Sequence, residues 1–386
     1  MNGEEASEGR CGASDERADK ARRADGPVPS GAGGGLRMTA LASLERHPAL
    51  RRSAALPCSP DATRAAHPIS EIGSRMPPNA APGGAISPKA PPRKAPTNVR
   101  VGVAGWSYPD WKGIVYPQRP GGDFDPLSFI ASRFGAVEVD SSFYHIPEPA
   151  RTAEWARKVA GFGGFRFSVK LFQGFTHTRK ASLVDERAFH RALEPLNRYG
   201  KLGAVLVQWP WSFRNTAENR KVLSDLLSRF AAYPLAVELR HASWASGDGR
   251  ALLRERNAAF CNIDQPALAQ CLGPANAVTS DLAYFRFHGR NAAAWFQEGA
   301  GRDARYDYLY SAAELAPWSE AIREASGVAR EVVAIFNNHF RGKAVANAFQ
   351  CQNALSGEKQ QVPPELIGAY DALEPISNTV FQRRLF

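Results

Sequence analysis

Acidic, basic and amide side chains recur at the ends of apolar segments along this 386-residue sequence. Carboxylates and imidazoles can move protons near neutral pH, and guanidinium and ammonium groups bind the oxygens of phosphates or carboxylates. These residue types predict general acid/base chemistry on a small anionic ligand, either phosphorylated or carboxylated. The candidate catalytic residues are Asp140, Asp264 and His288. The candidate ligand-binding residues are Trp106, Tyr108, Tyr144, Lys170, Gln208, Arg240, Trp244, Arg286, Arg290 and Asn338.

Alternation along the segments places several of these charges on common faces. Side chains two residues apart point to the same side of a strand, so Glu138 shares a face with Asp140. Buried charges are stable only when they are paired. We expect Glu138 and Glu238, which lie lower in their segments, to pair structurally with arginine or lysine. Arg286, which shares a face with His288, is either a ligand-binding residue at the rim or half of such a buried pair.

The remaining candidates divide by the chemistry of their side chains. Lys170 and three of the arginines would bind the anion. Asp140 or Asp264 would act as general base, and the candidate histidine would act as general acid. The aromatic candidates would wall the pocket and could stack on a sugar or base face. Ordinary core packing is the alternative for these rings, and it is favoured more for Trp106 than for Trp244.

Two further chemistries are open to the same residues. With His288, the carboxylates could ligate a divalent metal ion. Interleaved lysines and arginines would compete for those carboxylates, and no H-x-x-x-H pair is present, so no cofactor is expected. Lys170 as a Schiff-base nucleophile would need a strongly lowered pKa, whereas neighbouring carboxylates would raise that pKa.

Eight apolar segments must position these side chains, and amphipathic stretches separate them. This alternation predicts a (β/α)8 TIM barrel, a single domain whose active site lies at the C-terminal ends of its strands. No G-x-G-x-x-G loop supports the rival, an open dinucleotide-binding sheet. Helix starts are predicted at Asp125-Pro126, at Thr216 and at the capping box of Ser311 and Glu314. The predicted strands cover residues 99–107, 136–143, 165–172, 204–210, 235–241, 258–264, 283–289 and 331–338.

The first hundred residues differ in composition from the rest. All 21 Phe, 10 Tyr and 8 Trp residues follow Arg100, and a segment without aromatic residues has little apolar surface to bury. We expect a disordered leader over residues 1–97, a barrel over 98–355 and an extension over 356–386 that packs on the barrel. Met38 and Met76 are candidate true translation starts, which would make part of the leader an artefact.

The formal net charge of +10 favours anionic partners. Nucleic-acid binding or endonuclease-like repair is therefore an alternative function, because rim arginines and exposed aromatic rings suit phosphate contacts and base stacking. A non-catalytic binding or scaffold barrel is a third. Five cysteines without a C-x-x-C pair favour a reducing cytoplasm. No segment approaches the ~18 apolar residues of a membrane span, so no membrane partner is expected. Oligomeric state is left open.

Several strand-end motifs resemble those of the YecE-like family, also called domain of unknown function 72. The resemblance covers about residues 100–355 and implies a TIM-barrel fold, but no established activity. One departure is Gln208-Trp-Pro-Trp211, where family members more often resemble Q-L-P-P, so a shared ligand need not bind identically. The matching motifs include Gly105-Trp106-Ser107-Tyr108, Glu238-Leu-Arg-His-Ala-Ser-Trp244, Arg286-Phe-His-Gly-Arg290 and Phe336-Asn-Asn338.

Overall fold

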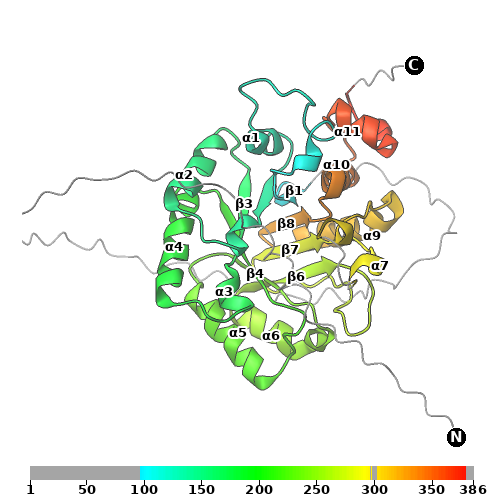
Figure 1. The fold of residues 1–386 in the computed structure, drawn as a ribbon. Coiled ribbons are helices and arrows are strands. Elements are labelled where there is room, and N and C mark those ends of the chain that lie inside the picture. The colour runs from blue at the N-terminus through cyan, green and yellow to red at the C-terminus, as the bar shows by residue number, and fades with distance from the viewer. Residues whose placement is uncertain (1–95, 296, 298–301, 380–386) are drawn as a thin grey trace, which may run out of the picture. The chain divides into compact units, whose positions relative to one another are not determined.

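Eight parallel strands form a closed barrel in the order β1-β2-β3-β4-β5-β6-β7-β8. The structure is a computed structural model that describes residues 96–295, 297 and 302–379. The expected leader and its alternative starts lie almost wholly outside these residues. Figure 1 shows the strands at the centre with helices around them. The barrel predicted from the alternation of apolar and amphipathic segments is confirmed.

All eight predicted strands are present. Most end earlier than the apolar segments that predicted them, because the last residues of those segments leave the sheet. The strands are β1 (Val99–Ala104), β2 (Ala136–Val139), β3 (Arg166–Lys170), β4 (Leu202–Gln208), β5 (Leu235–Glu238), β6 (Ala258–Asp264), β7 (Leu282–Phe287) and β8 (Glu331–Phe336).

Helices follow most of the strands and cover the outside of the sheet. The α-helices are α1 (Pro126–Ala131), α2 (Pro149–Lys158), α3 (Gln173–Thr176), α4 (Leu183–Arg198), α5 (Ala217–Arg229), α6 (Gly247–Glu255), α7 (Ala292–Trp295), α8 (Arg302–Arg305), α9 (Ala312–Ser326), α10 (Lys343–Ser356) and α11 (Pro364–Ala369). Short 3-10 helices are η1 (Pro109–Trp111), η2 (Ser141–Phe143), η3 (Ala242–Ala245), η4 (Phe340–Gly342) and η5 (Asp371–Ile376).

The three predicted helix starts are confirmed by their hydrogen bonds. Asp125 accepts from the backbone of α1, and Thr216 accepts from the backbone N–H of Asn219 in α5. Ser311 and Glu314 form a reciprocal capping box at the start of α9. These bonds satisfy N–H groups that have no partner inside the helix, so local sequence determines where these helices begin.

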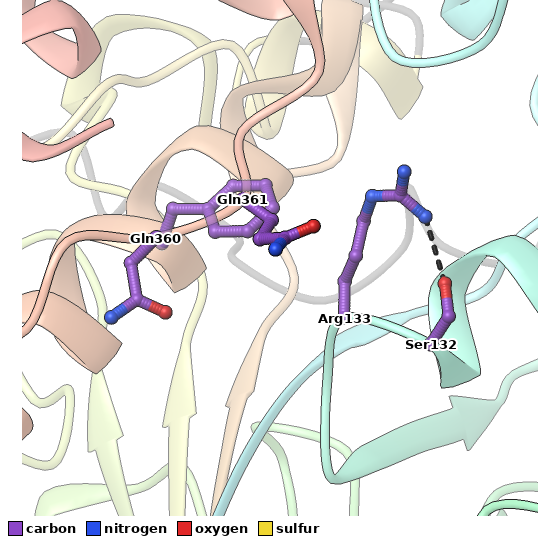
Figure 2. Close-up of a pocket in the computed structure, with 5 residues that line it drawn as sticks. Ser132, Arg133, Gln360 and Gln361 are labelled. Carbon is purple, nitrogen blue, oxygen red and sulfur yellow. Dashed lines mark hydrogen bonds between the residues drawn. The ribbon is translucent and has the colours of Figure 1, made fainter. Parts of the chain in front are cut away.

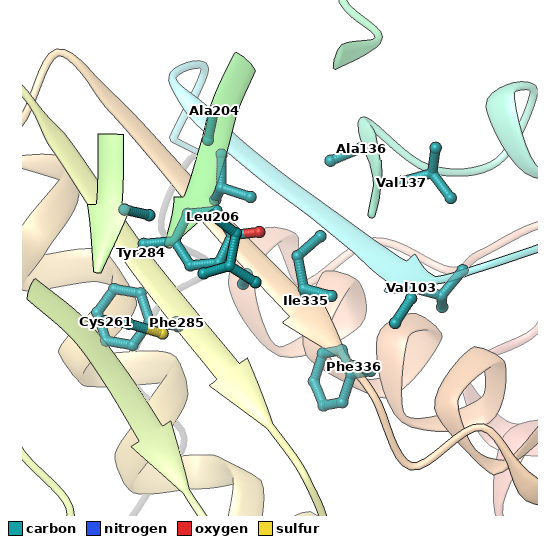
Figure 3. Packing of buried hydrophobic residues seen from close by; sticks show 14 of the residues in the cluster. Val103, Ala136, Val137, Ala204, Leu206, Cys261, Tyr284, Phe285, Ile335 and Phe336 are labelled. Atoms are coloured by element: carbon teal, nitrogen blue, oxygen red, sulfur yellow. The ribbon is translucent and has the colours of Figure 1, made fainter. Parts of the chain in front are cut away.

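Alternating side chains separate the inside of the barrel from its helix-covered outside. Register-paired residues of neighbouring strands face the same side, and Tyr284 pairs with Cys261 on β6. Figure 3 shows Leu206, Tyr284 and Ile335 among the buried side chains of the core. Phe285, one residue further along β7, packs against Trp318 of α9 instead. Even-numbered β7 residues from Tyr284 onward therefore face the interior.

The segment after α10 folds back against it. Helices α11 and η5 contact each other, and η5 also contacts α10. Leu366, Ile367 and Leu373 are buried there, and Gln360 forms a bridge with Ser377. None of the described helices is both long and apolar enough to cross a membrane.

A substitution at Gly102 tests how closely β1 and β2 approach each other. A Cβ atom at this position would lie 2.0 Å from the carbonyl oxygen of Ala136, so Gly102→Ala should lower the free energy of unfolding by about 1–3 kcal/mol. Gly121→Ala is the matched control, since nothing lies within 4 Å of a Cβ added there. Urea denaturation of both variants measures the difference. Equal stability of the two would contradict the packing described for this strand pair.

Candidate active site at the mouth of the barrel

A fully buried ionic cluster lies inside the barrel, near the C-terminal ends of its strands. The Arg286 guanidinium binds Glu138 through two hydrogen bonds, Nε to Oε2 at 3.0 Å and Nη2 to Oε1 at 2.5 Å. Its Nη1 binds Glu238. All three side chains are 0% exposed. Because they come from β7, β2 and β5, one guanidinium links three strands across the interior.

Electrostatics favour the charged forms of Arg286 and Glu238. Burial disfavours the charged form of Arg286, but the charges of Glu138 and Glu238 outweigh it and raise the arginine pKa well above its usual range. Burial likewise opposes ionisation of Glu238, yet Arg286 and Arg240 hold its pKa well below the usual value. Burial raises the pKa of Glu138, against the opposing charge of Arg286. Arg286 therefore links two buried carboxylates, as one of the two expectations held. It does not lie at the rim as a ligand-binding residue.

His288 extends the same cluster toward the C-terminal end of β7. Its Nδ1 lies 3.1 Å from the amide nitrogen of Asn337, and its Nε2 lies 3.3 Å from Glu238 Oε2. If Asn337 donates to Nδ1, the ring proton sits on Nε2 and points at Glu238. Burial lowers the pKa of His288 to about 4. The imidazole is then neutral at pH 7, and both of its nitrogens are engaged inside the protein.

Above the buried cluster, four predicted residues lie at the C-terminal ends of β2 to β5. Lys170 Nζ is 3.7 Å from Asp140 Oδ1. Arg240 Nε donates to Glu238 Oε1 at 2.6 Å. Gln208 pairs in register with Glu238, and its Oε1 has no hydrogen-bond partner within the described part of the chain. Unlike the layer below, Asp140, Lys170 and Arg240 are partly exposed.

Burial has the largest effect on the pKa of Lys170. It lowers the lysine pKa, and the opposing charge of Asp140 is too small to reverse this. From the sequence, we expected neighbouring carboxylates to raise the pKa of Lys170. That expectation treated every nearby carboxylate as a partner of the lysine. Glu138 and Glu238 are instead neutralised by arginines, and that leaves Asp140 as the only carboxylate within salt-bridge distance in the described residues.

Asp264 occupies a different place from the one expected of a general base. Its Oδ1 accepts from Arg290 Nε at 2.9 Å and from Tyr310 at 2.7 Å, and its Oδ2 accepts from Arg290 Nη2 at 2.6 Å and Trp318 at 2.7 Å. It pairs in register with Phe287, whose ring packs on Trp318 of α9. Asp264 therefore faces the helix layer, and donors occupy both of its oxygens.

Arg290 and Asn338 belong to this outer region as well. The bonds from Asp264 raise the pKa of Arg290 above its usual range, and Arg290 also contacts Glu314 at 3.3 Å. Asn338 is buried and donates to the Tyr308 carbonyl and to Asn347 of α10, both at 2.8 Å. These contacts fasten the ends of β7 and β8 to α9 and α10. They do not involve Asp140 or Lys170.

The aromatic residues predicted to wall the pocket differ in their burial. Trp244 is fully buried, and its indole donates to the Phe213 carbonyl at 2.7 Å, so it is a core residue and not the pocket wall expected. Trp106 is half-buried and meets Trp155 edge to face. Tyr108 stacks on His339 with 4.5 Å between centroids. Tyr144 is exposed beside the mouth.

The sequence analysis missed several polar partners. Tyr284 donates to Glu138 at 3.0 Å, and its position two residues before Arg286 was the signal that could have found it. Tyr310 and Trp318, which hold Asp264, lie on a loop and a helix that no strand alternation addresses. Asn337, the partner of His288, stood next to the residue chosen at the end of β8.

The described residues hold no group of three or more His, Cys, Asp or Glu side chains arranged for a metal ion. Three cysteines in the described residues are free thiols, Cys261, Cys271 and Cys351. Burial raises the pKa of Cys261 well above its usual range and that of Cys351 to about 12. Both thiols are therefore protonated and poor nucleophiles at neutral pH.

A cavity of about 230 Å³ lies at the opposite end of the barrel. Ser132 and Arg133, which line it, precede β2, whereas the mouth follows the strands. Figure 2 shows Gln361 reaching toward Arg133, with Ser132 bonded to that guanidinium at 2.8 Å. Phe349 of α10 and Gln360 complete the lining. In barrels of this class, chemistry takes place at the C-terminal ends of strands, so the cavity is separate from the mouth.

Comparisons with known proteins point to one family. Residues 100–369 match the family model described as "Protein of unknown function DUF72". The UPF0759 protein YunF of Bacillus subtilis (strain 168) is 29% identical over 288 residues, which span 70% of this chain and 100% of that protein.

Solved structures agree with this match. A DUF72 family protein from Thermotoga maritima is 34% identical with a TM-score of 0.59, over 67% of this chain and 98% of that one. Another, from Enterococcus faecalis, is 32% identical with a TM-score of 0.59, over 67% of this chain and 95% of that one. Residues 100–369, which match the family model, include the residues of the mouth.

Removal of the Arg286 guanidinium tests the buried cluster. Arg286→Met would leave Glu138 and Glu238 uncompensated, and the free energy of unfolding should fall by about 3–5 kcal/mol. Arg330→Met is the control, since Arg330 is 84% exposed and 3.8 Å from Asp281, and should cost less than about 1 kcal/mol. Chemical denaturation measures both. An Arg286 variant as stable as the control would show that the guanidinium is not a buried bridge.

Proposed function

The chain belongs to the DUF72 family, which is described only as proteins of unknown function, and we propose from its mouth that it is an enzyme acting on a small anionic substrate. The substrate carries a phosphate or carboxylate group. Proton transfer by side chains of the mouth drives the reaction, and no cofactor takes part. The free thiols of Cys261, Cys271 and Cys351 favour a reducing cytoplasm as its location.

One observation carries this proposal. Asp140, Lys170 and Arg240 are partly exposed at the strand ends, directly above charges that are completely buried. An ionic network with only a structural role gains nothing from an open end, because exposed ion pairs contribute little to stability. Charged groups held at the C-terminal mouth of a barrel are placed where substrates of such enzymes bind.

We propose a different role for each of the three groups. Arg240 is fixed by its bond to Glu238, and its guanidinium supplies positive charge for the substrate anion. Asp140 and Lys170 form the proton-transfer pair, because they face each other with opposite charge. Gln208 Oε1 offers a buried acceptor to a substrate hydroxyl. Tyr108 and Tyr144 wall the approach.

The other predicted residues support this arrangement from behind. Glu238 holds Arg240 on one side and lies within reach of His288 on the other. Since His288 is neutral and internally bonded, we assign it to positioning Glu238 and not to acid catalysis. Asp264 and Arg290 brace α9 against the barrel.

Anion binding by the full chain is tested by thermal unfolding with orthophosphate, glycerol 3-phosphate and pyruvate. A ligand present at 100 times its Kd stabilises the native state by about 2.7 kcal/mol, which should raise Tm by roughly 4–5 °C for a domain of this size. Arg240→Gln should remove the rise, measured from its own ligand-free Tm. Arg151→Gln, on the outer helix α2, should keep it.

Other patterns would contradict the proposal. Stabilisation by a short oligonucleotide without any effect of the small anions would favour nucleic-acid binding. No shift with any probe would favour a non-catalytic scaffold. A small-anion effect that survives Arg240→Gln but disappears with Arg151→Gln would place the anion outside the mouth.

A further inference from the structure

Lys170 combines placement and surroundings that its role in an ionic cluster does not require. It is the last residue of β3 and lies two residues beyond Ser168, which pairs in register with the inward-facing Glu138. The ammonium therefore points into the barrel near its mouth. Its side chain is only 13% exposed, so the charged form has lost most of its water.

The partners around Lys170 only weakly compensate for that loss. Asp140 lies 3.7 Å away, beyond hydrogen-bond distance. The Phe143 ring centroid is 4.3 Å from Nζ and adds a cation–π contact. Glu138 and Glu238 also act on Lys170, but both are bound to arginines, and the Arg286 cation repels it. These partners therefore replace only part of the water that the ammonium has lost, and burial lowers the pKa of Lys170.

We propose that Lys170 forms a covalent imine with the carbonyl group of an aldehyde or ketone that also carries a carboxylate or phosphate. The inference rests on the anion site proposed above, in which Arg240 binds the charged group. Arg240 follows β5, Lys170 ends β3 and Asp140 follows β2, so a molecule bound at Arg240 would lie at the same C-terminal mouth of the barrel as the amine and the carboxylate. Cys261 and Cys351 do not compete with Lys170 as nucleophiles, because burial raises the pKa of both thiols and keeps them protonated.

Asp140 moves the protons in this step. It takes one proton from the Lys170 ammonium, and the free amine attacks the carbonyl carbon to form the C–N bond while the carbonyl π electrons move to oxygen. A proton then passes from nitrogen to that oxygen, which gives a carbinolamine. Protonated Asp140 returns its proton to the hydroxyl group, which leaves as water, and the C=N⁺ bond forms. Ammonium and carbonyl become iminium and water, so charge and atoms balance without an oxidant or reductant.

The lowered pKa of Lys170 agrees with this geometry, because burial increases the fraction of free amine at neutral pH. Lys201 provides a comparison. Burial lowers its pKa too, but it lies before β4, at the opposite end of the barrel, and donates to the Phe162 carbonyl at 2.7 Å. No carboxylate is within salt-bridge distance of Lys201 among the described side chains, so it lacks the proton carrier that Lys170 has.

Borohydride trapping tests the inference on the unmodified full chain. Glyoxylate, the probe, is a small aldehyde with a carboxylate group, and it forms imines with any reactive amine. After reduction and digestion, mass spectrometry gives the extent of labelling at each lysine. We expect Lys170 to be labelled at least 10-fold faster than Lys201 and than Lys221, which is 76% exposed. Orthophosphate, which competes for Arg240, should slow labelling of Lys170 only.

Two variants identify the chemical roles. Lys170→Arg keeps the positive charge and should retain the anion-dependent rise in Tm while losing the adduct at residue 170. Asp140→Asn should lower the rate of labelling of Lys170 by about 10²–10⁴-fold, the range of general acid–base catalysis. In this variant the rate at which Lys221 is labelled should not change, so that lysine serves as an internal reference.

The outcomes separate this inference from the proposed function. Lys221 labelled as fast as Lys170, with the small anions still raising Tm through Arg240, would overturn the imine and leave the anion site intact. Preferential labelling of Lys170 with no anion effect on Tm or on the rate would support a reactive lysine but contradict the proposed anion site. Equal labelling and no anion effect would overturn both.

Discussion

The buried guanidinium of Arg286 is the constraint on which the rest of the barrel interior depends. A charge with 0% exposure is tolerated only when opposite charges and hydrogen bonds replace its water. Glu138 and Glu238 supply both, from strands on either side of β7. Once they are committed to Arg286, they cannot serve as bases or metal ligands. Their other contacts fix Tyr284, His288 and Arg240 in turn, so the cluster orders the floor of the mouth.

The same pairing gives the outer layer its chemical character. Because arginines neutralise the inner carboxylates, Lys170 keeps Asp140 as its near partner and remains largely desolvated. The second ionic cluster, around Asp264, lies on the other face of the sheet and holds α9 to the barrel. One cluster therefore prepares the mouth, and the other stabilises the helices around it.

Much of this arrangement follows from the sequence, and its failures have physical causes. Strand alternation predicted the barrel and the common faces of β2, β5 and β7, because side-chain direction there depends only on the backbone. Asp264 was selected because it ends β6, but Cys261 and Ile263 occupy the inner face of that strand, so its carboxylate faces outward. Trp244 was misplaced because loop packing against Phe213 decides its burial. The ionisation of Lys170 depends on which cation takes which carboxylate, and only the three-dimensional arrangement shows that.

The pKa of Lys170 tests the central claim most directly, because it measures whether the buried cluster leaves this amine undercompensated. Trace labelling with acetic anhydride between pH 6 and pH 12, read at the Lys170 peptide by mass spectrometry, gives that value without a substrate. The account predicts titration clearly below the ~10.4 of a free lysine side chain. Titration at or above that value would show that the carboxylates of the interior stabilise the ammonium, and would contradict the account.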